Sequence, residues 1–140
     1  MNLPLLLDTC ALVWIAGLAG DHHLGPVEEA LDQARAEGSA AFVSPMTAWE
    51  LGMLAAKGRL SFPMPIKAWL DQVVTTGQLR WAELSVDVLL AATALPGEVH
   101  GDPADRIIIA TARENGFRLV TRDRKILDYA GKGHVMALEC

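Results

Sequence analysis

The sequence predicts an α/β protein with three layers, in which helices cover both faces of a central, mainly parallel sheet. Short apolar segments alternate along the chain with longer segments that begin and end in helix signals, and this alternation is typical of such a sheet. The chain has 140 residues, of which 51% are hydrophobic and 21% charged. A chain of this length and composition can bury a core, and we expect residues 1–140 to form a single domain.

Helix starts are marked by capping residues. Ser44-Pro45 and Asp102-Pro103 each combine a capping side chain with proline in the first turn, and Ser85 and Asp123 cap two further helices. The apolar run over 3–7 favours a strand that is buried on both faces. The expected order is a strand over 3–7, a helix over 9–16, a loop up to Gly25, a helix over 26–37, a strand over 41–43, helices over 45–57 and 65–76, a strand over 79–84, helices over 86–94 and 103–115, a strand over 118–121, a short helix after Asp123 and a strand over 135–138.

Composition and cysteine content indicate where in the cell the protein is found. No apolar run reaches the roughly 18 residues that a membrane span needs. The residues before Asp8 include no basic segment of the kind that opens a signal peptide. The two cysteines, Cys10 and Cys140, have no CxxC spacing and are too few for a disulfide framework. We therefore expect a cytoplasmic protein with no membrane contact.

Charge is unevenly distributed. The net charge is −5, with −6 over residues 1–100 and +1 over residues 101–140. The basic residues thus gather late in the chain, which permits a local surface for nucleic acid and equally fits a solvated helix face.

Four acidic residues stand where a site is expected. Asp8 ends the first predicted strand and Asp123 follows the strand over 118–121, and ligand sites of parallel sheets lie at such carboxyl ends. Either residue could instead serve only as a helix cap. Glu50 and Asp105 fall on apolar helix faces, where a carboxylate is costly unless it is paired or bound to a metal. If the four converge, a hard cation such as Mg²⁺ is the natural counter-charge, and it would activate water and polarise a phosphodiester.

Other chemistries find little support. The sequence has no GxGxxG or GxxxxGK[ST] phosphate loop and no GxSxG elbow, and its histidines (His22, His23, His100 and His134) lack zinc-helix spacing. The tryptophans lie in apolar segments, so we interpret them as core residues rather than as platforms for bases; they are Trp14, Trp49, Trp69 and Trp81. A stripe of Ile66, Trp69, Leu70 and Val73 is open to two interpretations, core or an exposed surface for a partner.

Four stretches together resemble the PIN-domain family, and within it the VapC-type toxins. They are LLLDTCALVW at 5–14, SPMTAWELGMLAAKGRL at 44–60, HGDPADRIIIATA at 100–112 and LVTRD at 119–123. The resemblance implies a PIN-like fold and an endoribonuclease that depends on Mg²⁺ or Mn²⁺. It further implies a homodimer that is inhibited by a small cognate antitoxin.

The same resemblance assigns roles to individual residues. Asp8, Glu50, Asp105 and Asp123 match the four family acids and would be the catalytic and metal-binding residues. Thr9 and Thr121 match the supporting hydroxyl positions, and Asp102 is expected to act as a helix cap beside the site. Arg106 and Arg122 are candidates for contacts with RNA phosphates.

Two other functions remain open from the residues alone. A phosphatase of the haloacid dehalogenase type would use an aspartate that ends the first strand, but it requires a second acid two residues later, where this chain has Cys10. A PIN fold can also serve as a non-catalytic interaction module, although the presence of all four acids argues against it.

Overall fold

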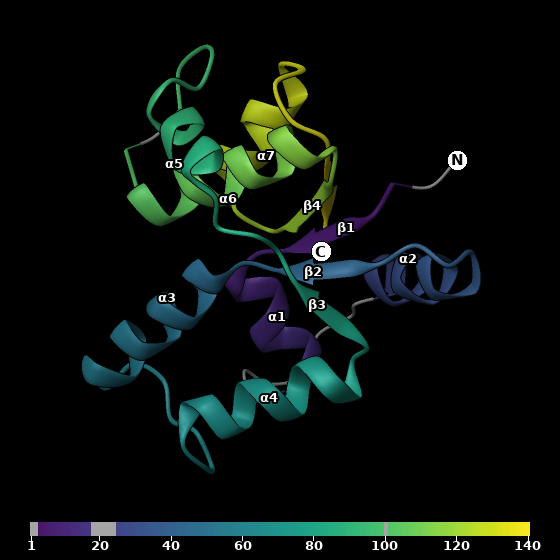
Figure 1. The fold of residues 1–140 in the computed structure, drawn as a ribbon, viewed down its shortest axis with the longest axis vertical. Coiled ribbons are helices and arrows are strands. Elements are labelled where there is room, and N and C mark those ends of the chain that lie inside the picture. The colour runs from purple at the N-terminus through teal and green to yellow at the C-terminus, as the bar shows by residue number, and fades with distance from the viewer. Residues whose placement is uncertain (1–2, 18–24, 100) are drawn as a thin grey trace.

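The computed structural model describes residues 3–17, 25–99 and 101–140 (Figure 1). His22, His23, His100 and most of the loop expected before Gly25 lie outside these residues. No helix in the described ranges is both long enough and apolar enough to cross a membrane.

The centre of the molecule is a sheet of five parallel strands, which confirms the predicted fold class. The strands are β1 (Leu5–Leu7), β2 (Ala41–Val43), β3 (Leu79–Trp81), β4 (Arg118–Thr121) and β5 (Ala137–Glu139). They pair in the order β3-β2-β1-β4-β5, and all four pairings are parallel. The chain therefore builds outward from β1 in one direction, then returns to the other side of β1 to add β4 and β5. Ligands bind at the carboxyl ends of strands where the winding reverses in this way, which here lies between β1 and β4.

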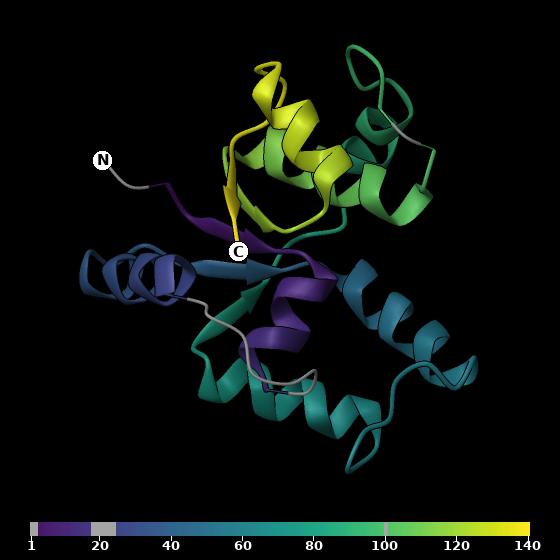
Figure 2. The ribbon, with the colours of Figure 1, turned by 180° about the vertical axis from the view of Figure 1, so that it is seen from behind.

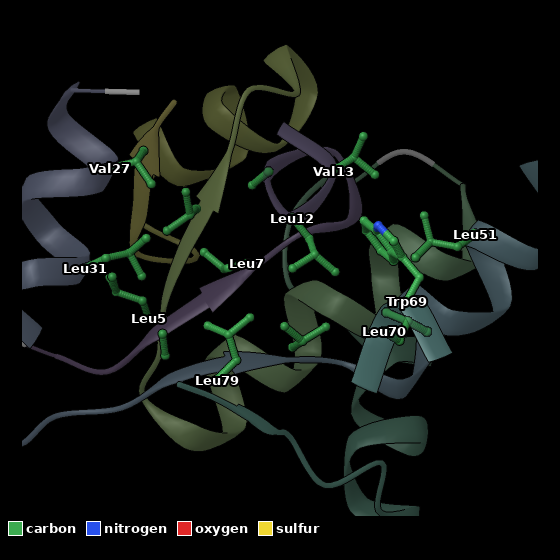
Figure 3. Packing of buried hydrophobic residues seen from close by; sticks show 14 residues of the cluster. Leu5, Leu7, Leu12, Val13, Val27, Leu31, Leu51, Trp69, Leu70 and Leu79 are labelled. Carbon is green, nitrogen blue, oxygen red and sulfur yellow. The ribbon is translucent and has the colours of Figure 1, made fainter. Parts of the chain in front are cut away.

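Helices cover both faces of the sheet (Figures 1 and 2). They are α1 (Thr9–Ile15), α2 (Gly25–Ala36), α3 (Pro45–Ala56), α4 (Ile66–Thr76), α5 (Val86–Thr93), α6 (Pro103–Asn115) and α7 (Arg124–Gly131). The first core contains buried side chains of α1, α2, α3 and α4, while a second contains those of α6 and α7. The two cores lie on opposite faces of β1, because Leu5 and Leu7 belong to the first and Leu6 to the second. Figure 3 shows the first core, with Leu5 and Leu7 among its side chains.

Two strands differ from the bounds that their apolar residues predicted, because each ends where its paired neighbour ends. The expected strand over 79–84 stops at Trp81, and the amide of Ala82 makes the last bond to the carbonyl of Val43. Its partner β2 cannot extend further, because Ser44 accepts a hydrogen bond from the amide of Met46 and begins α3. The last strand likewise covers 137–139 rather than 135–138.

The interpretation of the tryptophans was right for one residue and wrong for two. Trp69 is 5% exposed and packs edge-on against Phe62 at a ring-centroid distance of 5.0 Å, so its stripe is core and not a partner surface. Trp49 and Trp81, by contrast, are 57% and 42% exposed. Both lie in apolar segments, but each side chain points away from the two cores.

Candidate active site

Asp8 lies at the carboxyl end of β1, where the winding of the sheet reverses. Its Oδ1 accepts a hydrogen bond from the amide of Ala11 at 2.8 Å, so the residue caps α1 as the sequence suggested. The side chain is buried, and burial raises the pKa of this carboxyl, with a smaller contribution in the same direction from the charge of Asp123. Hydrogen bonds from the Thr121 hydroxyl and the Ala11 amide oppose this increase in the pKa.

Thr121 joins the two acids that follow adjacent strands. Its side chain is fully buried, lowers the pKa of Asp8, and accepts a hydrogen bond from the backbone amide of Asp123 at 3.0 Å. Asp123 in turn caps α7, because its Oδ1 accepts from the amide of Ile126 at 3.1 Å. Asp8 and Asp123 thus each cap a helix and also lie where the winding of the sheet reverses. The two interpretations from the sequence, a helix cap and a site residue, are therefore compatible.

Glu50 is held by the start of α1. Its Oε1 accepts a hydrogen bond of 2.6 Å from the hydroxyl of Thr9, and that hydroxyl lies 3.0 Å from the hydroxyl of the fully buried Thr47. Burial is the main reason that the pKa of Glu50 is raised; the Thr9 hydrogen bond lowers it, and the charges of Asp102 and Asp8 raise it. Thr47 was missed by the sequence analysis, since a threonine three residues before an acid carries no signal without its partner in α1.

Asp102 precedes α6 as its N-cap, and Asp105 lies in the first turn of the helix. Oδ1 of Asp102 accepts from the amides of Ala104 and Asp105 at 2.9 and 3.3 Å, which is the expected cap. Burial, followed by the charges of Asp102, Glu50, Asp123 and Asp8, raises the pKa of the Asp105 carboxyl to about 7. The charges of the other three predicted site acids thus all contribute to the raised pKa of Asp105.

A hollow of about 480 Å³ opens at this edge of the sheet. It is lined by Gly101, Asp102, Asp105, Asp123, Arg124 and Lys125. Arg124 and Lys125 are exposed at the start of α7 and line the hollow beside the acids, and Arg124 forms an ion pair of 2.9 Å with Glu139; the sequence analysis did not single them out. The two arginines that it did single out have other contacts. Arg106 Nε donates to the carbonyl of Ala92 at 2.9 Å, and the guanidinium of Arg122 lies 3.1 Å from the centre of the Trp14 ring.

The donor set fits a hard divalent cation. Carboxylate and hydroxyl oxygens are the ligands that Mg²⁺ and Mn²⁺ prefer, and Mg²⁺ uses one or two carboxylates together with water rather than a full protein cage. Across residues 3–17, 25–99 and 101–140, no three side chains of His, Cys, Asp or Glu are gathered closely enough to enclose an ion by themselves. The acids thus share one electrostatic environment without forming a closed cage.

A parallel α/β sheet with a group of partly buried carboxylates near its reversal point defines a class of protein suited to cation-dependent chemistry on an anionic substrate. Comparison with known proteins is more specific. Residues 5–132 match the PIN domain, and the chain belongs to this family. The resemblance found in the four sequence stretches is thereby confirmed.

Relatives and solved structures agree with this assignment. The chain is 40% identical over 84 residues to ribonuclease VapC22 of Mycobacterium tuberculosis, a match that covers 60% of this chain and 63% of that protein, less than two thirds of its length. Among solved structures, VapBC2 from Rickettsia felis bound to a promoter DNA fragment is similar with a TM-score of 0.66 at 16% identity, covering 96% of both chains. A toxin–antitoxin complex from Klebsiella pneumoniae has a TM-score of 0.57 at 24% identity, covering 96% of this chain and 95% of that one. At these identities the two structures establish the shared fold.

Proposed function

We propose that this protein is a metal-dependent endoribonuclease and the toxin of a type II toxin–antitoxin system. The observation that carries the proposal is the set of four acids, Asp8, Glu50, Asp105 and Asp123, at the reversal point of a PIN-domain sheet. The 40% identity to a ribonuclease supports the same activity. The protein would act in the cytoplasm, where RNA is available. Residues 1–140 would form the single domain that carries the site.

The four acids would hold Mg²⁺ or Mn²⁺, which when bound lowers the pKa of water and stabilises charge on a phosphodiester. The chain's own residues orient these ligands. Thr9 fixes one oxygen of Glu50, and Thr121 lowers the pKa of Asp8 while it also anchors the backbone at Asp123. These supporting hydroxyls are of the kind that tune ligand geometry in metal sites.

Positive charge near the acids would position the RNA. Arg124 and Lys125 line the same hollow as Asp105, so they are suited to the phosphates on either side of the cut, and Arg124 would exchange its ion pair with Glu139 for a phosphate. Arg122 remains a candidate from its place beside Asp123, and Arg106 could use its Nη donors while Nε keeps the bond to Ala92. A cognate antitoxin and a second copy of the chain are the protein partners that we propose.

Cleavage of a single-stranded RNA by the purified protein, with Mg²⁺, with Mn²⁺ or with EDTA, tests the proposal. We expect cleavage only with a divalent ion, and its loss in Asp8→Asn and Asp105→Asn with the fold retained by circular dichroism. Asp71→Asn is the matched control, because this acid lies on the surface of α4 in an ion pair of 2.6 Å with Lys67. Wild-type cleavage by Asp105→Asn would show that the acid assignment is wrong.

Two further measurements separate the alternatives. Release of phosphate from a phosphomonoester without cleavage of RNA would indicate a phosphatase. Absence of both metal binding and cleavage would indicate a non-catalytic module. For the toxin assignment, expression without a partner should arrest the growth of a bacterial host and Asp8→Asn should relieve the arrest, whereas equal arrest by the variant would point to toxicity from misfolding.

A further inference from the structure

A second hollow, of about 330 Å³, opens between α3 and α6 next to the acids. Its lining includes Trp49, Glu50, Met53, Lys57, Arg59 and Asp102. Asp102 also lines the hollow of the candidate active site, so the two are neighbours along the first turn of α6. Glu50, a proposed ligand, forms part of the wall of the second hollow.

One wall is a row of exposed side chains on α3. Trp49, Met53 and Lys57 follow one another at intervals of four residues and therefore lie on the same face of the helix. Trp49 is 57% exposed and Met53 is 38% exposed. A Cβ placed on Gly52, which lies between them in sequence, would meet no atom within 4 Å. The helix surface beside this row is thus open, and the indole itself is more than half exposed.

The same hollow has charges of both signs, Lys57 and Arg59 beside the carboxylates of Glu50 and Asp102. Lys57 and Arg59 are exposed, and neither forms an ion pair with any residue in the described parts of the chain. The protein as a whole has a net charge of −5. Two cations without ion-pair partners beside an exposed indole suit a ligand that has both phosphates and an aromatic surface, and a nucleotide within single-stranded RNA meets both requirements.

We propose that this hollow is a nucleotide subsite, in which an unpaired RNA base stacks on Trp49 and the adjoining phosphates contact Lys57 and Arg59. The subsite rests on the proposed ribonuclease function. Trp49 directly precedes Glu50 in α3, so a strand that places its scissile phosphate at the acids would carry a neighbouring base onto the indole. The subsite would make cleavage depend on an unpaired base beside the cut, and it would tolerate any base, because every base presents a stacking face.

Binding of a fluorescein-labelled RNA decamer in EDTA, followed by anisotropy, tests the stacking. Trp49→Ala should weaken binding by about 5- to 150-fold, which corresponds to about 1–3 kcal/mol, and Trp49→Phe should restore most of it. Trp81→Ala is the matched control, since Trp81 is also exposed but belongs to the lining of neither hollow. A series of decamers, each with one abasic nucleotide at a different position, locates the stacked base. The loss of the base at one position should weaken binding to the wild type, and the same loss should have no effect on binding to Trp49→Ala.

The charges have a separate signature. Lys57→Gln and Arg59→Gln should each reduce the slope of log affinity against log salt by about 0.7, the value for one contact with a single strand. Trp49→Ala should leave that slope unchanged. Lys67→Gln, which removes an exposed lysine already paired with Asp71, is the control for loss of one positive charge.

The outcomes separate the subsite from the function on which it rests. If the wild type binds and cuts RNA while Trp49→Ala binds the whole abasic series as the wild type does, the subsite is wrong and the nuclease stands. If the wild type neither binds nor cuts RNA, both proposals fail. If Trp49→Ala leaves RNA binding unchanged but lowers the mass of the protein in sedimentation, this face contacts a second protein molecule and the subsite is wrong.

Discussion

The hydroxyl of Thr9 donates a hydrogen bond of 2.6 Å to the carboxylate of Glu50, which joins α1 to α3 across 41 positions of sequence. The same hydroxyl lies 3.0 Å from that of Thr47. Because a hydroxyl has only one proton, Thr9 gives its proton to Glu50 and Thr47 donates to Thr9. Two hydroxyls, one of them fully buried, therefore fix the orientation of one proposed metal ligand.

We expect Thr9→Val to lower the rate of RNA cleavage about 10- to 100-fold, the range for loss of a partner that orients a metal ligand. Valine keeps the shape of threonine but leaves Glu50 without its donor. Thr9→Ser retains the hydroxyl and should recover most of the activity. The control is Thr93→Val, which removes a surface hydroxyl bonded only to the carbonyl of Leu90. Cleavage at increasing Mg²⁺ measures the effect, and an unchanged rate in Thr9→Val would show that Glu50 needs no positioning.

Asp102 should act as a cap and not as a ligand. Asparagine caps a helix as well as aspartate does, whereas alanine costs about 0.5–2 kcal/mol of stability. Asp102→Ala should therefore lower the free energy of unfolding in urea by this amount, and Asp102→Asn should leave it nearly unchanged. Asp102→Asn should also retain far more cleavage activity than Asp105→Asn. A folded but inactive Asp102→Asn would instead place this carboxylate among the ligands.

Features set by a few adjacent residues could be predicted from the sequence. The caps Ser44, Ser85, Asp102 and Asp123 each accept the expected amide hydrogen bond, because cap and donor lie within three residues of each other. The end of β3 could not be predicted in this way, because it depends on where β2 stops. Four acids at one edge were expected from the strand ends and helix faces. The contact between the hydroxyls of Thr47 and Thr9, the partner of Glu50, could not be predicted, because it requires the packing of α1 against α3.

Whether a tryptophan in an apolar segment is buried or exposed also depends on tertiary packing that the sequence does not show. The difference can be tested by measurements of stability. Trp69 is buried in the first core against Phe62, so Trp69→Ala should cost about 3–5 kcal/mol of unfolding free energy. Trp81→Ala removes the same side chain from a half-exposed position and should cost far less. Urea denaturation compares the two variants. A small loss of unfolding free energy in Trp69→Ala would instead support the alternative interpretation, in which this stripe of α4 is an exposed surface for a partner.

The stability of the metal-free protein should fall as the pH rises through the range in which Asp105 ionises. The pKa of this carboxyl is about 7 in the folded protein against an ordinary value of 3.8, mainly through burial and then through the neighbouring charges. Between these two values the folded state binds more protons than the unfolded state, so the contribution of Asp105 to the free energy of unfolding decreases with rising pH and levels off above about 7. This is the opposite of an aspartate in a salt bridge.

Asp105→Asn removes the ionisation but keeps the size of the side chain. In EDTA at pH 8, this variant should therefore melt at a higher temperature than the wild type, and the difference should disappear as the pH approaches 4. Excess Mg²⁺ should reverse the order, because an ion at 100 times its Kd stabilises a folded protein that binds it by about 2.7 kcal/mol and the variant lacks one ligand. Asp71→Asn, which alters only a surface ion pair, should show no gain in EDTA at any pH. If Asp105→Asn melts lower than the wild type in EDTA at pH 8, this acid mainly stabilises the start of α6, and mutual repulsion among the four carboxylates does not control the stability of the site.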